Sequence, residues 1–324
     1  MFSSEYLKDI SDKAISGLKS YRDAERLYDP VKYVLSQGGK RIRPVLCLMS
    51  CNLFSDQIDD AIMPAAGFEV FHNFTLVHDD IIDKAELRRG SPTVHHKWGL
   101  NQAVLSGDVM AFIASEYISQ APDPVLGKLL RLYNQTAIQV CVGQQLDIDF
   151  ENKAVVTDSE YLHMIELKTA VLIAASLKAG ALIGNAPEKD QNLLYEFGRC
   201  LGIAFQIQDD LLDTYGDTKV FGKKTGGDIV SNKKTWLLVK AFELADGEQL
   251  AKLKSLILQK EFDPEEKVKT VKEIFDSLNV RLLAENLSYE YINKAFESLD
   301  AVMVKESRKT ELKQMATGLI GRER

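Results

Sequence analysis

Two clusters of aspartates are the groups in this sequence best suited to chemistry. Both have the spacing D-D-x-x-D, and both lie inside apolar stretches, "LVHDDIID" and "FQIQDDLLD". The clusters consist of Asp79, Asp80 and Asp83, and of Asp209, Asp210 and Asp213. On a helix, residues four apart project from one face, about 6 Å from each other. Two such clusters facing each other would repel strongly unless cations lay between them.

The ligand type indicates which cation would bind. Carboxylate oxygens with no cysteine or histidine cluster nearby favour Mg²⁺, or Mn²⁺, over zinc. Magnesium binds one or two carboxylates together with substrate phosphates, so the pattern predicts a phosphorylated substrate. A single cluster is better explained as a solvated helix end. Two copies, each in an apolar segment where an unpaired carboxylate is costly, favour the metal-binding interpretation.

Basic residues that could bind phosphate oxygens occur in three places. The segment "GGKRIRP" supplies the first group after Gly38 and Gly39, and a glycine pair lets the backbone approach a phosphate closely. The second group follows the first acidic cluster, and the third lies in the lysine-rich stretch 216–234. The three groups are Lys40, Arg41 and Arg43; Arg88 and Arg89; and Lys223, Lys224, Lys233 and Lys234.

Two histidines lie near the first acidic cluster. His72 precedes Asp79 by two helical turns, on nearly the same side of a helix. A lone histidine is more often structural, but a position facing the same cavity as the aspartates makes His72 a candidate binding residue. His78 is rotated by about 100° from Asp79 and is better explained as an orienting or packing residue.

Helix signals occur throughout the chain and strand signals are almost absent, which predicts an all-α fold. Helix starts are marked by Asp123-Pro124, by a capping box at 157–160 and by Asp263-Pro264. One helix is predicted from the capping box to Gly184-Asn185. It contains "AVLIAASLKAGALIG", which is apolar on more than one face. Such a helix belongs at the centre of a large bundle.

Length and composition are those of an ordinary folded protein. The chain has 324 residues, of which 45% are hydrophobic and 27% charged. No linker or composition shift divides it, so we expect one large helical domain over residues 1–324. The irregular stretch 216–234 is predicted to be a functional or mobile loop, because loops of that length are uncommon inside compact domains.

Charge, cysteines and hydropathy exclude several other classes of protein. A net charge of −7 argues against non-specific nucleic-acid binding, which needs a basic surface. The four cysteines, Cys47, Cys51, Cys141 and Cys200, lack zinc-like spacing and are predicted to be reduced core thiols. The N-terminus is polar, and no apolar run reaches the roughly 18 residues that span a bilayer. We therefore expect a cytoplasmic protein without a transmembrane segment.

The motifs together resemble those of the trans-isoprenyl diphosphate synthases, or polyprenyl synthetases. The matching segments are "GGKRIRP", "LVHDDIID…LRRG", "GQQLD", "KTA" and "FQIQDDLLDTYGD…GKKTGGDI…NKK", in the same order over residues 38 to about 236. The resemblance implies an all-α bundle around a deep central cavity, the isoprenoid synthase fold, and a homodimer. It also implies a Mg²⁺-dependent prenyltransferase that joins isopentenyl diphosphate to an allylic diphosphate.

The same resemblance assigns residues to roles. It makes Asp79, Asp83, Asp209 and Asp213 metal ligands, supported by Asp80 and Asp210. It places the allylic diphosphate (dimethylallyl, geranyl or farnesyl) at Arg88, Lys168, Lys223 and Lys233, with Thr169 and Gln206 beside its reacting end. It places isopentenyl diphosphate at Lys40, Arg43, His72 and Arg89. Gln144 and Asp147 in "GQQLD" are expected to line the cavity.

Product length is expected to depend on residues just upstream of the first acidic cluster. In the family, bulky side chains there form the cavity floor, and this chain has Phe74, the small Thr75 and Phe71. By resemblance this combination suggests a C20 product first and a C15 product second. A helical wheel alone would place Thr75 and Phe71 nearer to the face of Asp79 than Phe74.

Three other interpretations remain open at this point. The chain could be a longer-chain polyprenyl diphosphate synthase. The pair His78-Asp79 could belong to an HD-type metal phosphohydrolase, although that leaves the second acidic cluster and "GGKRIRP" unexplained. The chain could also be a non-catalytic partner subunit, although such subunits usually lose aspartates from one motif and both motifs are complete here.

Overall fold

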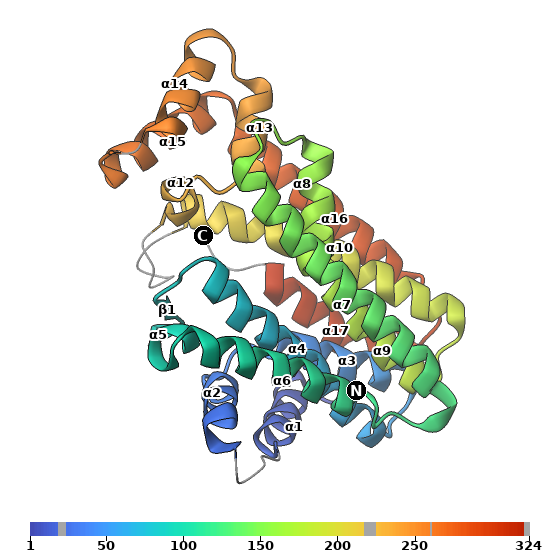
Figure 1. Cartoon of the computed structure of the whole chain (residues 1–324). Coiled ribbons are helices and arrows are strands. Elements are labelled where there is room, and N and C mark those ends of the chain that lie inside the picture. The colour runs from blue at the N-terminus through green and yellow to red at the C-terminus, as the bar shows by residue number, and fades with distance from the viewer. Residues whose placement is uncertain (19–23, 217–224, 260, 321–324) are drawn as a thin grey trace. The chain divides into compact units, whose positions relative to one another are not determined.

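The computed structural model describes residues 1–18, 24–216, 225–259 and 261–320. The chain divides into two compact units. The first unit comprises Met1–Gln135, Ala175–Tyr195 and Val302–Lys313, and the second comprises Thr136–Ala174, Glu196–Ala301 and Gln314–Arg324. The single domain over residues 1–324 stays a prediction. The all-α prediction is confirmed, because nearly all described elements are helices (Figure 1).

Helices of the first unit carry the first acidic cluster and "GGKRIRP". They are α1 (Ser4–Ser16), α2 (Glu25–Ser36), α3 (Ile42–Phe54), α4 (Asp59–Ile82), α5 (Val94–Trp98) and α6 (Leu100–Ile118), with parts of α7 (Asp123–Asn152), α9 (Val171–Ile183), α10 (Glu188–Tyr215) and α17 (Glu306–Ile320). α4 packs mainly against α6 and α3. A Cβ on Gly67 would lie 2.9 Å from the carbonyl oxygen of Ala114, so α4 and α6 require glycine at that contact.

A two-residue hairpin follows α4 and was not expected from the sequence. Strands β1 (Leu87–Arg88) and β2 (Ser91–Pro92) pair antiparallel. Arg89 and Gly90 between them have φ values of 53° and 76°, the positive pair that tight hairpin turns need. The hairpin therefore fixes both arginines just beyond the end of the helix that carries the first acidic cluster.

The second unit contains the second acidic cluster and the lysine-rich stretch. Its helices are α8 (Asp158–Ile165), α12 (Gly227–Val230), α13 (Trp236–Leu244), α14 (Gly247–Leu258), α15 (Pro264–Ser277) and α16 (Val280–Asp300), with parts of α7, α9, α10 and α17. Its core includes Phe150, Tyr161, Trp236 and Phe275. The predicted starts are confirmed at Asp263, whose side chain accepts from the backbone of α15, and at the capping box on α8.

The helix predicted from the capping box to residue 184 is interrupted. A π-helical turn, η2 (Glu166–Ala170), separates α8 from α9. A Cβ on Gly143 would lie 2.3 Å from the backbone nitrogen of Lys168, so α7 approaches this turn very closely. π-helical turns concentrate at functional sites, and this one carries the "KTA" segment. The predicted end is confirmed, because α9 stops at Ile183 and Asn185 has a φ of 59°.

The described part of the stretch 216–234 contains a helix, which corrects the expectation of one long loop. The helix α12 forms within it, and Lys267 from α15 donates to Asn232 Oδ1 at 2.7 Å. Residues 217–224, with Lys223 and Lys224, lie outside the described residues. No helix in the described part of the chain is long and apolar enough to cross a membrane.

The cysteine prediction is correct for three positions. Cys47, Cys51 and Cys200 are free and buried. Cys141 is free but exposed, because it lies on a solvent-facing position of α7, so its assignment to the core was wrong.

Candidate active site

The first acidic cluster lies at the C-terminal end of α4, where Asp83 is the residue that caps the helix. Asp80 is buried and Asp83 is exposed. Arg88 donates to Asp80 Oδ1 from Nε and from Nη2, both at 2.8 Å. Its Nη2 also lies 3.9 Å from Asp79 Oδ2. Burial raises the pKa of Asp80, and the Arg88 guanidinium opposes that shift.

Arg88 therefore has a role that its sequence position did not reveal. The resemblance assigned it to the allylic diphosphate, whereas its guanidinium is directed at the aspartates of its own unit. The hairpin makes this possible because it turns the chain back after α4. Arg88 compensates the buried charge of Asp80 and leaves the more exposed Asp79 and Asp83 at the edge of the cluster.

Three residues assigned to isopentenyl diphosphate form a cationic cluster in the first unit. Arg43 Nε is buried and has no hydrogen-bond partner among the described residues. Burial lowers the pKa of Arg43 to about 10, and the nearby charge of Arg89 acts in the same direction. Burial and the charges of Arg43 and Arg89 also hold the pKa of His72 well below its ordinary value, so His72 is neutral at pH 7. Such under-neutralised positive charge is suited to binding an anion.

The loop before α3 packs against this cluster. Arg89 Nη1 donates to the carbonyl oxygen of Gly38 at 2.5 Å. A Cβ on Gly39, which has a φ of 140°, would lie 3.1 Å from the same nitrogen. The glycine pair therefore lets an arginine lie against the backbone. Lys40, in the same loop, is exposed.

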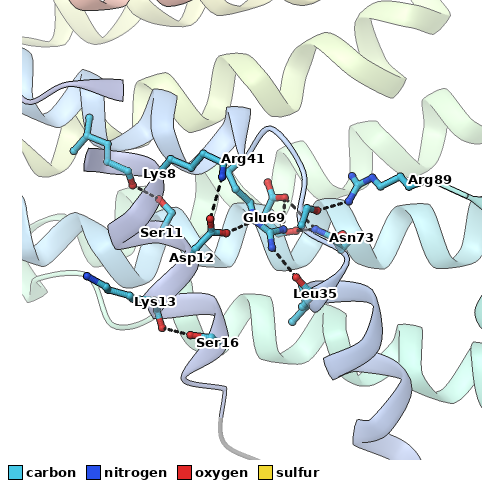
Figure 2. Close-up of polar contacts among 12 residues, drawn as sticks. Lys8, Ser11, Asp12, Lys13, Ser16, Leu35, Arg41, Glu69, Asn73 and Arg89 are labelled. Carbon is cyan, nitrogen blue, oxygen red and sulfur yellow. Dashed lines mark hydrogen bonds and ion pairs between the residues drawn. The ribbon is translucent and has the colours of Figure 1, made fainter. Parts of the chain in front are cut away.

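Arg41 differs from the other basic residues of "GGKRIRP". The sequence grouped it with Lys40 and Arg43 as a cation for the substrate. Its side chain is instead buried and bound to Asp12 Oδ1, Glu69 Oε1 and the carbonyl oxygen of Leu35 (Figure 2). Arg41 is therefore an internal group, and the sequence grouping was wrong for this residue.

Two of the three residues proposed to set product length, Phe71 and Phe74, are aromatic and pack together on α4. Phe71 is buried, and its ring centroid lies 5.4 Å from that of Phe74. Thr75 is partly buried, and its Oγ1 donates to the carbonyl oxygen of His72 at 2.8 Å. Tyr133 on α7 packs edge-on against Phe71 at 5.5 Å. Tyr133 gave no signal in the sequence, because its contact with Phe71 is long-range.

His78 packs as the sequence suggested. Its ring stacks edge-on with Phe74 at 4.8 Å, and Nε2 lies 3.3 Å from the carbonyl oxygen of Val104 on α6. A Cβ on Gly107 would lie 2.2 Å from the same nitrogen, so α6 makes room for this ring. This packing supports the interpretation of His78 as an orienting or packing residue rather than a member of a metal site.

The second acidic cluster, on α10, is held by neutral donors. Asp210 is buried, and its Oδ2 accepts from the Tyr161 hydroxyl and, at 3.2 Å, from the backbone N–H of Trp236. Its Oδ1 accepts from Gln206 Nε2 at 3.2 Å. Burial raises the pKa of Asp210 to about 6, and these hydrogen bonds oppose the shift. Asp209 is exposed.

A fourth carboxylate, Asp228 of α12, joins this cluster and was missed from the sequence. Its backbone N–H donates to Asp213 Oδ2 at 3.0 Å. Burial raises the pKa of Asp228 to about 7, repulsion from Asp213, Asp210 and Asp209 adds to the shift, and Lys233 opposes it. The aspartate in "TGGDI" was visible in the sequence, but the turn that returns it to α10 was not.

The π-helical turn places two more predicted residues in the second unit. Lys168 Nζ forms an ion pair with Asp147 Oδ2 at 2.6 Å. Thr169 Oγ1 donates to Gln206 Oε1 at 3.1 Å, and Gln206 in turn donates to Asp210. These contacts join "GQQLD", "KTA" and the second acidic cluster. Gln144 is partly buried on α7, and Lys223 lies outside the described residues.

The donor sets fit a hard divalent cation. In the described ranges, no group of three or more histidine, cysteine, aspartate or glutamate side chains is arranged to hold a metal ion by itself. Burial nevertheless raises the pKa of Asp210, Asp213 and Asp228 together. Carboxylate oxygens gathered in this way are the hard ligands that Mg²⁺ prefers, and a bound cation would favour their charged forms.

Comparisons with known proteins agree with this geometry. Residues 24–275 match the family model described as polyprenyl synthetase. The chain is 38% identical over 314 residues to a geranylgeranyl diphosphate synthase of Methanosarcina mazei, covering 96% of this chain and 94% of that protein. It is 36% identical to a short chain isoprenyl diphosphate synthase of Methanothermobacter thermautotrophicus, covering 93% and 92%.

A solved structure is similar to this chain in both sequence and fold. It is a crystal structure of a geranylgeranyl pyrophosphate synthase, with a TM-score of 0.95, 38% identity and 100% of both chains covered. The family model covers most of the chain, and the relatives are matched over nearly their whole length. The chain therefore belongs to the polyprenyl synthetase family.

Proposed function

We propose that this protein is a short-chain trans-prenyl diphosphate synthase. It condenses isopentenyl diphosphate with an allylic diphosphate, head to tail, and releases diphosphate. The observation that carries the proposal is the pairing of two intact aspartate clusters with an under-neutralised cationic cluster in one chain of this family. Relatives named as geranylgeranyl and short chain isoprenyl diphosphate synthases support it.

In this proposal isopentenyl diphosphate binds at the cationic cluster of the first unit. Arg43 and Arg89 contribute charge, and Arg43 has a buried nitrogen without a partner among the described residues. The neutral imidazole of His72 contributes a hydrogen bond rather than charge. Lys40 is exposed in the adjoining loop and reaches the diphosphate from solvent.

The allylic diphosphate is assigned to the acidic clusters and to the basic residues near them. Lys168 and Lys233 hold its oxygens as negative charge builds on them, and Arg88 adds a third contact. Lys223 remains a predicted ligand. Thr169 and Gln206 present oxygen dipoles to the reacting carbon, which becomes positively charged.

Magnesium, or manganese, fits the donor set described above. Asp79, Asp83, Asp209 and Asp213 would hold it, with Asp80 and Asp210 in supporting positions. When bound, the metal neutralises the charge that the diphosphate gains as a leaving group.

The proposed reaction proceeds by ionisation of the allylic diphosphate, formation of a C–C bond and loss of a proton. The allylic C–O bond breaks, and its electron pair leaves with the diphosphate. The double bond of isopentenyl diphosphate attacks the allylic cation, which forms the new C–C bond. The proton lost from the neighbouring carbon passes to the released diphosphate. The protein's part is to hold both diphosphates, orient the two carbons and exclude water, because water would trap the cation.

A C20 product is proposed first and a C15 product second. The packing of Phe71 against Phe74 and Tyr133 supports a bulky floor on α4. Phe74→Ala and Phe71→Ala should therefore lengthen the product, as measured by chromatography of the dephosphorylated alcohols. Products of unchanged length in both variants would contradict the floor.

A homodimer is also proposed, and α6 supplies the supporting observation. This helix exposes large apolar side chains on one face, at Leu100, Val104, Leu105 and Phe112, the last with 75% of its surface accessible. A second copy of the chain would cover them. Light scattering of Phe112→Glu should report monomers where the wild type forms dimers, and an unchanged dimer would contradict this interface. The cytoplasmic location stays a prediction.

A direct assay tests the function. The purified protein is incubated with Mg²⁺, isopentenyl diphosphate and each allylic starter in turn, and the products are identified by mass spectrometry. We expect chain extension with one diphosphate released per bond formed. Phosphate or diphosphate release without a longer prenyl chain would favour a hydrolase. Complete inactivity of the pure chain with every starter would favour a non-catalytic partner subunit.

A further inference from the structure

The segment 38–43, which carries Lys40 and Arg43, consists of the loop before α3 and the first two residues of that helix, and its backbone is unusual. Gly38 and Gly39 have φ values of 70° and 140°, and Arg41, immediately before α3, has a φ of 49°. The left-handed region disfavours residues with a side chain, so a non-glycine residue remains there only when its surroundings hold it. The side chain of Arg41 is the obvious candidate for that restraint.

All three guanidinium nitrogens of Arg41 are bound to other parts of the first unit. Nε donates to Asp12 Oδ1 at 2.7 Å, Nη1 to Glu69 Oε1 at 3.0 Å, and Nη2 to the carbonyl oxygen of Leu35 at 2.6 Å (Figure 2). These partners lie on α1, α4 and α2. The side chain of Arg41 is only 3% exposed. A guanidinium fixed by three elements has little freedom to turn towards a substrate.

Glu69 connects this anchor to the helix of the site. Its carboxylate is buried, and Oε1 also accepts from Asn73 Nδ2 at 3.2 Å. The same helix, α4, carries His72 one turn later. The negative charge of Glu69 opposes the lowering of the pKa of both Arg43 and Arg89. Glu69 is thus the anion that balances the cationic cluster from within the protein.

The far side of the loop is fixed as well. Arg89 Nη1 donates to the carbonyl oxygen of Gly38, and a Cβ on Gly39 would press against the Arg89 guanidinium, 3.1 Å from Nη1. A displacement of the loop would therefore move Lys40 and Arg43 and would remove the backbone partner of Arg89. All three are residues assigned to isopentenyl diphosphate.

We infer that Arg41 is a positioning residue: its buried ion pair with Glu69 holds the segment 38–43 so that Lys40, Arg43 and Arg89 converge on the diphosphate of isopentenyl diphosphate. This inference rests on the proposed function. Arg41 does not touch that substrate. Its effect should fall on isopentenyl diphosphate rather than on the allylic substrate, because Lys40 and Arg43 lie in the segment that it holds and Arg89 donates to the carbonyl oxygen of Gly38.

Arg41→Gln tests the inference together with the double variant Arg41→Gln/Glu69→Gln. The single variant leaves the Glu69 carboxylate buried without its cation, so it should lower the melting temperature. The double variant removes both charges and keeps amide groups that can hydrogen-bond, so it should recover much of that loss. Both variants lack the guanidinium that binds three helices at once, so the segment 38–43 should be displaced in both.

The measured quantities are the dissociation constant of isopentenyl diphosphate by calorimetry, the KM of each substrate and the melting temperature. Both variants should bind isopentenyl diphosphate about tenfold or more weakly, while the KM of the allylic substrate stays within about twofold. Arg41→Lys should recover affinity only in part, because an ammonium lacks the planar fork. Lys32→Gln, which removes an exposed cation from α2, is the control and should match the wild type.

Three results would overturn the inference. The first is wild-type affinity for isopentenyl diphosphate in folded Arg41→Gln. The second is a double variant that recovers affinity in step with its melting temperature, which would mean a structural role only. The third is an equal loss for both substrates. If the wild type itself binds no isopentenyl diphosphate, the proposed function fails first, and the inference with it.

Discussion

The two acidic clusters share one sequence motif, yet their surroundings differ. Asp80 and Asp210 occupy the same place in the motif and are buried to the same degree, at 4% and 3% exposure. Asp80 is balanced by the full positive charge of Arg88 at 2.8 Å. Asp210 is held by a phenol, an amide and a backbone N–H, none of which carries a charge.

The difference appears in the pKa values. Burial raises the pKa of both carboxyls, and in the second cluster it raises the pKa of Asp210 to about 6 and that of Asp228 to about 7. Lys233 offsets part of the negative charge of the second cluster, but burial still leaves its carboxyls with raised pKa values. The repeated motif determines which ligand atoms are present. The residues that pack against the motif determine how much of the carboxylate charge is left for a cation to balance.

Removing the first aspartate of either cluster should have the largest effect. Asp79→Ala and Asp209→Ala should each lower kcat by a factor of about 10³ or more, because each loses charge that would hold the metal and the leaving group. Steady-state assays with saturating substrates measure this. Asp59→Ala, in the exposed first turn of α4, is the matched control and should keep wild-type turnover. Near-normal turnover in both acidic-cluster variants would contradict the roles assigned to them.

The charged partner of Asp80 and a neutral partner of Asp210 should contribute differently to the stability of the protein. Arg88→Gln leaves the buried carboxylate of Asp80 without its cation and should cost about 2–3 kcal/mol of unfolding free energy. Tyr161→Phe removes one neutral donor from Asp210 and should cost about 1–2 kcal/mol. Denaturant unfolding of the metal-free protein at pH 7.5 measures both.

The pH dependence of Arg88→Gln sharpens this contrast. Without the guanidinium, the pKa of Asp80 rises further above its value in the unfolded chain. A carboxyl with a raised folded pKa binds more protons folded than unfolded, so stability falls as pH rises through that window. The cost of Arg88→Gln should therefore be larger at pH 8 than at pH 5. A cost independent of pH would mean that Arg88 does not act through its charge.

Local signals in the sequence predicted much of this molecule. The helix starts at Asp263 and at the capping box on α8 follow from residues within one turn of each other, and both are confirmed. The two D-D-x-x-D motifs and the basic loop were found in the same way. Each prediction depended on spacing along the chain, which a sequence displays directly.

Long-range partners could not be predicted, and they decide the electrostatics. Tyr161 reaches Asp210 across 49 positions, and Asp12 reaches Arg41 across 29. Nothing near Arg41 distinguishes it from Lys40 or Arg43, because all three are basic residues of one short segment. The π-helical turn at Glu166–Ala170 was missed for the same reason, since the close approach of Gly143 on α7 is a tertiary contact.

The smallest expected effect is on the pH dependence of stability and concerns the cationic cluster, whose excess charge is positive rather than negative as in the acidic clusters. Burial and the charges of Arg43, Arg89, Arg88 and Arg41 lower the pKa of His72 well below its ordinary value. In the unfolded chain the His72 imidazole therefore binds a proton near pH 6.5, whereas in the folded chain it stays neutral at that pH. Stability contributed by neutral His72 is present above about pH 6.5 and is lost as pH falls, by at most about 1.4 kcal/mol per pH unit.

His72→Gln should remove that part of the pH dependence, because an amide does not titrate. Unfolding free energies at pH 7.5, 6.5 and 5.5 measure the slope, which should be shallower in the variant than in the wild type. His163→Gln changes an exposed histidine on α8 of the second unit and should leave the wild-type slope unchanged. Equal slopes in the wild type and His72→Gln would mean that the arginines do not suppress protonation of His72. The cationic cluster of the first unit would then lack the excess positive charge that sets it apart from the acidic cluster around Asp228 in the second unit.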